Sequence, residues 1–148
     1  LQDVNDTDVN VNVDKGVVLI SLSDGMLYKS GSYEILPRAG EILGKIAKVI
    51  NDYSTFDVLI EGNTDNVPIK NSCMLDNWDL SVKRATSIAR ALQLQYAVNP
   101  ARIIAGGRSE FYPKVANDTP ANKAINRRTE IIIMPKLDEF FKLLEIKK

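Results

Sequence analysis

Alternating apolar and polar residues near the start of the chain predict a β-hairpin. From position 9 to position 14, valines alternate with Asn and Asp, and a period of two is typical of a strand. The turn residues Asp14-Lys15-Gly16 follow, and positions 17–22 form a mostly apolar run typical of a second strand. We therefore expect these two strands to pair with each other across the turn.

Two longer segments carry apolar residues at the three- and four-residue spacing of an amphipathic helix. The first begins near Pro37, a residue type favoured in the first helical turn, and continues to about Asp52. The second extends from about Asp79 to Tyr96 and is stopped by the Asn99-Pro100 pair. The chain is therefore expected to contain two helices that each bury one face.

Three further strands are predicted, at 56–61, 102–105 and 128–134, with a polar loop over 111–125. Strands and helices thus follow one another as β-α-β-α-β-β. This order predicts an α+β fold, a two-layer sandwich with helices on one face of a mixed four-stranded sheet. The N-terminal hairpin strand and a short C-terminal helix would be additions to that core.

Composition and charge exclude several classes of function. The 148 residues include 19 basic and 19 acidic side chains, and this balance argues against binding nucleic acid or a membrane surface through bulk charge. The chain has no histidine and a single cysteine, Cys73, so catalytic triads, zinc sites and an internal disulfide are excluded. We expect neither a metal nor a cofactor. One cysteine fits a reducing compartment or a periplasmic protein without disulfides.

Polar residues that bear charge gather where the predicted strands end. Asp65 follows the strand at 56–61, Arg84 lies in the first turns of the next helix, and Asn126-Arg127-Arg128 opens the last strand. If the sheet brings these ends together, the site suits a zwitterion: Asp65 would accept an ammonium and Arg84 would bind a carboxylate through paired hydrogen bonds. The alternative is a structural Asp65–Arg84 ion pair that fixes the loop to the helix.

Thr64-Asp65 followed by Asn66-Val67-Pro68-Ile69, together with several other motifs in the same order, resembles the OmpA-like peptidoglycan-binding family, and this variant of the motif is similar to the MotB-type members. The resemblance covers about residues 17 to 134 and is carried by Tyr28-Lys29-Ser30-Gly31-Ser32, Leu36-Pro37, Ile60-Glu61-Gly62-Asn63-Thr64-Asp65-Asn66-Val67-Pro68-Ile69, Asn77-Trp78-Asp79-Leu80-Ser81-Val82-Lys83-Arg84-Ala85, Pro113, Asn117-Asp118-Thr119 and Asn126-Arg127-Arg128-Thr129-Glu130-Ile131. It divides the chain into an N-terminal extension (1–16), the family domain (17–135) and a C-terminal helix (136–148).

The resemblance implies a domain that binds the cell wall without catalysis, through the diaminopimelate residue of the peptidoglycan stem peptide. Asp65 and Arg84 match the two principal ligand contacts of the family. Because adjacent strand residues point to opposite faces, we expect only one arginine of Arg127-Arg128 to face the ligand. The family's sheet order is 1-4-2-3, with the last strand antiparallel to its neighbours. The secondary ligand positions carried over are Thr64, Asn77, Leu80, Asn126 and Arg127.

The chain departs from the family pattern at three places. Asn63 stands where a histidine is common, and we expect it to keep a role in supporting the loop. The Gly-x-Gly after the third core strand reads Gly107-Arg108-Ser109, so the second glycine is lost. The loop from Asn66 to Asp76 is longer than in many members and is expected to form a wall of the site or lie over it.

Three alternatives remain open at the level of sequence. The domain anchors an outer-membrane or envelope protein to the wall from the periplasm, with membrane contact only through a region missing from this chain, or it belongs to a MotB-like motor stator. An enzyme that cleaves the wall would use Glu61 and Asp65 as a carboxylate pair, but a sugar cleft lined with aromatics is not evident. Apolar residues at 137, 140, 141 and 144 predict a helix that packs on the domain or forms a homodimer surface.

Overall fold

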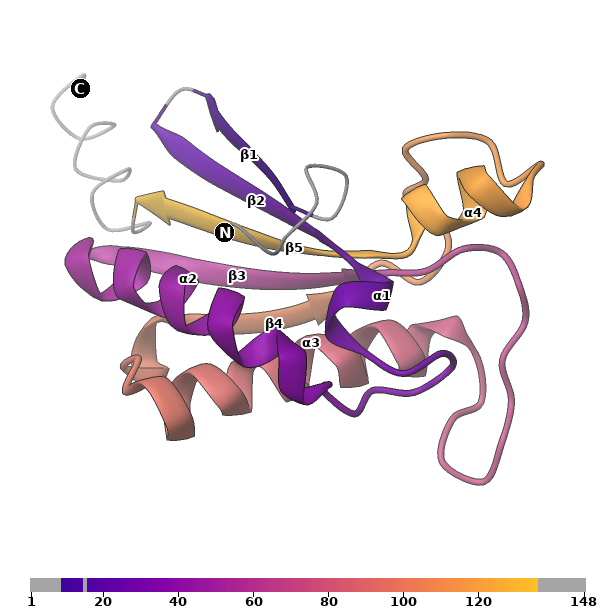
Figure 1. The fold of residues 1–148 in the computed structure, drawn as a ribbon, viewed down its shortest axis with the longest axis horizontal. Helices are drawn as coiled ribbons and strands as arrows, with labels where there is room; N and C mark the ends of the chain where they lie inside the picture. Colours follow the sequence, from indigo (N-terminus) through magenta and orange to yellow (C-terminus); the bar gives the residue numbers. More distant parts are fainter. Residues whose placement is uncertain (1–8, 15, 136–148) are drawn as a thin grey trace, which may run out of the picture.

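The computed structural model describes residues 9–14 and 16–135. Figure 1 shows one open sheet with the longer helices on one of its faces, as the α+β expectation requires. The predicted C-terminal helix and the first eight residues of the N-terminal extension lie outside the described residues. No helix in the described part of the chain is long and apolar enough to cross a membrane.

The sheet has five strands in the order β1-β2-β5-β3-β4. β2, β5, β3 and β4 reproduce the predicted 1-4-2-3 core order, and β1 adds a fifth strand at the edge by pairing antiparallel with β2. β5 is antiparallel to both of its neighbours, whereas β3 and β4 are parallel. The strands are β1 (Val9–Asp14), β2 (Val17–Ser23), β3 (Phe56–Asn63), β4 (Ile103–Gly107) and β5 (Arg128–Pro135).

The two predicted helices are present and share one face of the sheet (Figure 1). They are α2 (Gly40–Asp52), preceded by the 3-10 turn η1 (Pro37–Ala39), and α3 (Asn77–Tyr96). α3 begins two residues earlier than expected because the carboxylate of Asp76 caps it, accepting a hydrogen bond from the Asp79 N–H at 3.3 Å. The buried aliphatic side chains of both helices meet those of β2, β3 and β5 to form the core.

Two short helices were not predicted. α1 (Asp24–Leu27) follows β2 directly, and α4 (Pro120–Asn126) lies within the segment 111–125 that the polar composition assigned to a loop. α4 begins at Thr119, whose hydroxyl accepts a hydrogen bond from the Asn122 N–H at 3.1 Å, with proline at the first helical position. Its seven residues are too few for an apolar stripe to reveal it. A further 3-10 turn, η2 (Pro100–Arg102), precedes β4.

Two glycines allow α3 to approach the sheet closely. Gly62 of β3 and Gly107 of β4 are directly paired, and both lie under the same turn of α3. A Cβ atom on Gly62 would overlap the carbonyl oxygen of Ser81, and one on Gly107 would overlap the Ser81 hydroxyl. This close packing holds the first turns of α3, which carry Arg84, beside the end of β3, which leads to Asp65.

Candidate functional site

A polar cavity of about 350 Å³ lies at the end of the sheet where β2 and β3 finish and β5 begins. It is formed by the turn after β2, the loop after β3, the first turns of α3 and the residue just before β5. Every predicted site residue except Asn126 lines it. The lining residues are Asp24, Ser30, Gly31, Thr64, Asp65, Val67, Pro68, Ile69, Asn77, Leu80, Arg84 and Arg127.

Asp65 is held in place by hydrogen bonds to its carboxylate and to its backbone carbonyl oxygen. One carboxylate oxygen accepts from the Val67 N–H at 3.0 Å, and the other accepts from Arg127 Nη1 at 2.7 Å. Asn77 fastens the loop to α3, because its amide donates to the carbonyl oxygens of Asp65 (3.3 Å) and Val67 (3.1 Å). The Thr64 hydroxyl donates to the Asp65 carbonyl at 2.8 Å. Thr64 and Asn77 therefore position the carboxylate through its backbone.

The Arg84 guanidinium is anchored by four contacts, and the residue is only 3% exposed. Its Nε donates to the carbonyl oxygen of Ser32 at 2.7 Å, and Nη2 donates to that of Lys29 at 3.4 Å. Nη1 forms an ion pair with Asp24 at 3.0 Å, and the group stacks on the Tyr28 ring at 4.7 Å. Each terminal nitrogen carries two N–H groups, and the contacts above use one on each.

Asp24 is the charged residue that the sequence reasoning missed. It pairs with Arg84 at 3.0 Å and with Arg127 Nε at 3.2 Å, and Arg127 continues to Asp65. The four side chains therefore form a chain of alternating charge, Arg84–Asp24–Arg127–Asp65. The structural alternative considered above, a direct Asp65–Arg84 pair, is not the pairing observed among the described residues. The register of the sheet is the signal for Asp24, because Ser23 pairs with Arg128, so the residue after β2 meets the residue before β5.

Burial shifts the acid–base properties of the Arg84–Asp24 pair. Loss of solvent raises the pKa of the Asp24 carboxyl, and the neighbouring guanidiniums of Arg84 and Arg127 oppose this rise. Burial likewise lowers the pKa of Arg84, and Asp24 opposes that change. Each charge of this pair thus costs desolvation energy that its partner offsets in part. A ligand that brings one positive and one negative group offers new partners without changing the net charge of the site.

The structure separates the roles of the three residues Asn126-Arg127-Arg128. Arg127 lines the cavity, whereas Arg128 points to the other face, where it pairs with Glu130 at 3.0 Å. This confirms that only one of the two arginines reaches the cavity. Asn126 does not line this cavity: its fully buried amide holds the 114–117 segment through hydrogen bonds to Lys114, Val115 and Asn117.

The comparison with known families agrees with this geometry. The family model described as the OmpA family matches residues 27–127, which include Asp65, Arg84 and the motifs around them. The chain belongs to the OmpA family.

Relatives of this OmpA-family domain come from several envelope proteins. The chain is 31% identical to Motility protein B of Bacillus subtilis over 80% of its own length and 46% of the relative's. It is 30% identical to the protein named "Probable lipoprotein YiaD" of Escherichia coli, over 87% of this chain and 57% of that protein. The chain thus spans about half the length of the curated relatives it matches.

A solved structure confirms the fold of the OmpA-family domain. The cell wall anchor of the T6SS from Pseudomonas aeruginosa superposes with a TM-score of 0.83 at 27% sequence identity. The match covers 91% of this chain and 93% of that one. The arrangement of helices over one mixed sheet is therefore shared across nearly the whole chain.

Ser109 shows how the OmpA-family domain tolerates the loss of its second glycine. The residue has a left-handed backbone with φ of 55°, a conformation that glycine adopts without strain. Its carbonyl oxygen accepts from the Thr64 N–H at 2.9 Å, and its own N–H donates to the Ser81 hydroxyl at 3.1 Å. These two hydrogen bonds connect the segment just after β4 to the loop after β3 and to α3.

Glu61 and Asp65 do not form a catalytic pair in one cleft. Asp65 lines the cavity described above, whereas Glu61 lines a different pocket on the face of the sheet that carries Glu130. Glu61 forms an ion pair with Arg108 at 2.8 Å and accepts a hydrogen bond from the buried amide of Asn63 at 3.3 Å. Glu61 and Asn63 both belong to β3, so the Asn63 side chain contacts its own strand and does not line the cavity.

Proposed function

We propose that this OmpA-family domain binds peptidoglycan non-covalently through the diaminopimelate residue of the stem peptide. The observation that supports this most strongly is the alternating Arg84–Asp24–Arg127–Asp65 chain along one cavity. The far end of diaminopimelate carries an ammonium and a carboxylate on one carbon. Asp65 accepts the ammonium, while Arg84 and Arg127 donate to the carboxylate.

Binding exchanges ion pairs within the cavity. The ligand ammonium shares Asp65 with Arg127, which is one-third exposed and can turn toward the ligand carboxylate. Arg84 stays in place because its backbone contacts to Ser32 and Lys29 do not involve the ligand. Leu80, Val67 and Pro68 supply an apolar wall beside the aliphatic carbon chain of diaminopimelate. The fixed guanidinium thus selects the carboxylate, and the loop carboxylate selects the ammonium.

We infer a periplasmic location and an anchoring role for the longer protein, attached to the outer membrane or to an envelope complex. The likeness to a cell wall anchor and to a protein named as a lipoprotein supports this role. A motor stator subunit is the second candidate, favoured by the identity to Motility protein B. The upstream part of the gene distinguishes them: a membrane helix bearing an aspartate indicates a stator, and a lipidated cysteine or a β-barrel indicates an outer-membrane anchor.

We infer that the domain is not an enzyme, because its carboxylates at Glu61 and Asp65 open into different pockets. The relatives above also bear the names of motility, lipoprotein and anchor proteins. Incubation of the purified domain with sacculi tests this. We expect the protein to pellet with the sacculi and to release no soluble fragments, whereas release of muropeptides at a constant rate would contradict the inference.

The Arg84→Lys substitution tests the proposed carboxylate contact. Lysine keeps the charge but loses the planar fork, so we expect the affinity for diaminopimelate to fall about 10-fold or more. The melting temperature should also fall, since lysine cannot keep the Ser32, Lys29 and Asp24 contacts together. Titration calorimetry and thermal melting measure both effects.

Arg90→Lys, on the exposed side of the same helix, is the matched control and should change neither quantity. An Arg84→Lys variant that melts earlier but binds with unchanged affinity per folded molecule would show that Arg84 only braces the fold. Wild-type protein should also bind diaminopimelate more tightly than lysine, which lacks the second carboxylate.

A further inference from the structure

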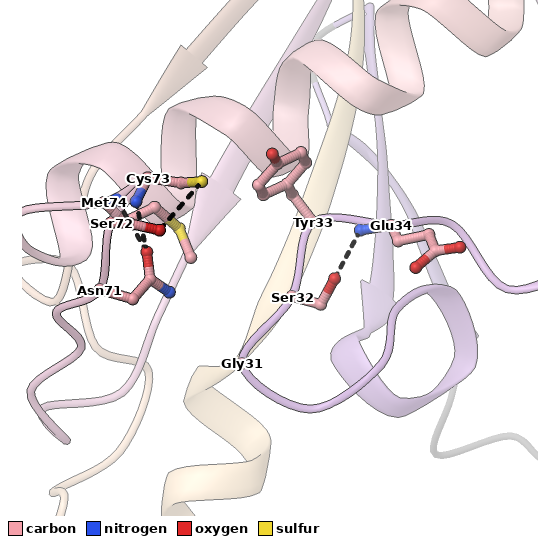
Figure 2. Close-up of a pocket in the computed structure, with 8 residues that line it drawn as sticks. All are labelled: Gly31, Ser32, Tyr33, Glu34, Asn71, Ser72, Cys73 and Met74. Atoms are coloured by element: carbon pink, nitrogen blue, oxygen red, sulfur yellow. Dashed lines mark hydrogen bonds between the residues drawn. The ribbon is translucent and has the colours of Figure 1, made fainter.

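A second groove adjoins the proposed diaminopimelate cavity. It has a volume of about 530 Å³ and lies between the segments Gly31–Glu34 and Asn71–Met74 (Figure 2). Gly31 lines both the groove and the cavity that contains Asp65 and Arg84. The two hollows therefore adjoin each other at Gly31.

Gly31 is the point where the groove and the cavity meet. Its φ of 65° is left-handed, which suits glycine, and a Cβ atom there would lie 3.8 Å from the side chain of Ile69. Such a distance is ordinary van der Waals contact, so glycine is favoured here by its backbone conformation rather than by lack of space.

Both walls of the groove are fixed by hydrogen bonds. On one side, the Asn71 side-chain oxygen accepts from the N–H groups of Cys73 (2.8 Å) and Met74 (2.9 Å), and Met74 is buried. On the other side, the Ser32 carbonyl accepts from Arg84 Nε at 2.7 Å. The guanidinium that lines the cavity therefore also holds a wall of the groove, which makes the two hollows one structural unit.

The groove offers apolar contact and a bordering cation. Figure 2 shows the Tyr33 ring between the two walls, while the Glu34 carboxylate is directed away from the Asn71–Met74 wall. Lys83 Nζ lies 5.5 Å from the centre of the Tyr33 ring. These groups suit a peptide with small alkyl side chains and a free carboxylate, because an aromatic ring packs on methyl groups and an ammonium attracts the carboxylate.

We propose that this groove is a subsite for the residues of the stem peptide bonded to diaminopimelate, with Tyr33 as its main apolar contact. The proposal rests on the proposed function, because it takes diaminopimelate in the neighbouring cavity as the starting point of the peptide. The longer loop after β3, which supplies Asn71–Met74, then has a defined role as the second wall of a peptide groove. Selectivity for a peptide over the free amino acid would come from this groove.

Titration of two ligands tests the subsite. The wild-type protein should bind the tripeptide L-Ala-γ-D-Glu-meso-diaminopimelate more tightly than free meso-diaminopimelate. Tyr33→Ala should lower the affinity for the tripeptide about 3- to 10-fold, the range expected for one aromatic contact. The affinity for free diaminopimelate should stay unchanged. Lys83→Gln should likewise lower the affinity for the tripeptide and leave the affinity for free diaminopimelate unchanged. Tyr53→Ala, at an exposed aromatic beyond α2, is the matched control and should change neither affinity.

The outcomes separate the subsite from the proposed function. Equal affinity of the wild type for both ligands, or equal loss of both in Tyr33→Ala, would overturn the subsite and leave the diaminopimelate cavity standing. Failure of the wild type to bind either ligand would overturn the proposed function and the subsite with it.

Discussion

Replacing Asp65 with alanine is expected to abolish binding to sacculi while the fold is retained. The carboxylate is the proposed acceptor for the ligand ammonium, and loss of one buried, hydrogen-bonded ionic contact typically costs about 2–5 kcal/mol, or roughly 30-fold or more in affinity. The fold should survive because Asp65 lies in a loop, and Arg127 keeps its second partner, Asp24, at 3.2 Å. Titration with a diaminopimelate-containing peptide and thermal melting measure the two effects separately.

Asp52→Ala provides the matched control for this prediction. Asp52 is an exposed carboxylate at the end of α2, beside the start of β3, whereas the cavity follows the end of β3. Its removal changes the net charge by the same amount and should leave binding unchanged. If Asp65→Ala bound the peptide as tightly as the wild type, the role assigned to Asp65 would be wrong.

Replacing Gly62 with alanine is expected to destabilise the domain strongly. The added methyl group would overlap the carbonyl oxygen of Ser81. Because this oxygen belongs to the backbone of α3, the overlap can be relieved only if the helix moves. Overpacking of this kind costs about 3 kcal/mol, which lowers the melting temperature by roughly 6–12 °C in a domain of this size. Since α3 also carries Arg84, the shift should weaken diaminopimelate binding in the molecules that remain folded.

Gly106→Ala is the control for Gly62→Ala. Gly106 lies in the neighbouring strand β4, directly paired with Glu61, and a Cβ atom there would meet nothing within 4 Å. Alanine should therefore be tolerated with little change in melting temperature. Equal stability of both variants in thermal melting would show that the close approach of α3 to Gly62 is not needed for the fold.

The sequence predicts the elements of this fold well where an apolar pattern is long. The hairpin, the two long helices and the core strands have enough apolar residues to show a period of two or of about 3.6, and packing enforces the same pattern. α4 was missed because its start depends on the Thr119 cap and the following proline rather than on apolar spacing. β3 extends two residues beyond its predicted end because it stays paired with β5 as far as Asn63 and Arg128.

The candidate site was only partly predictable, because one of its contacts depends on the pairing of strands that lie far apart in the sequence. Asp65, Arg84 and Arg127 stand where strands end or helices begin, and such positions meet at one edge of a sheet. The partner of Arg84 was not predictable from spacing, because Asp24 reaches it through the register of β2 and β5, strands far apart in the sequence. Asn126 was expected among the ligand residues from the family resemblance alone, and in the structure its buried amide holds the 114–117 segment and does not line the cavity.

The central claim is that the alternating charges around Asp65 and Arg84 recognise diaminopimelate in the cell wall. A pelleting assay tests it most directly, with sacculi that carry diaminopimelate in one tube and sacculi that carry lysine at the same stem position in the other. We expect the wild-type domain to sediment with the diaminopimelate sacculi and to stay in the supernatant with the lysine sacculi. Equal sedimentation with both kinds of sacculi, or sedimentation of Asp65→Ala to the level of the wild type, would contradict the claim.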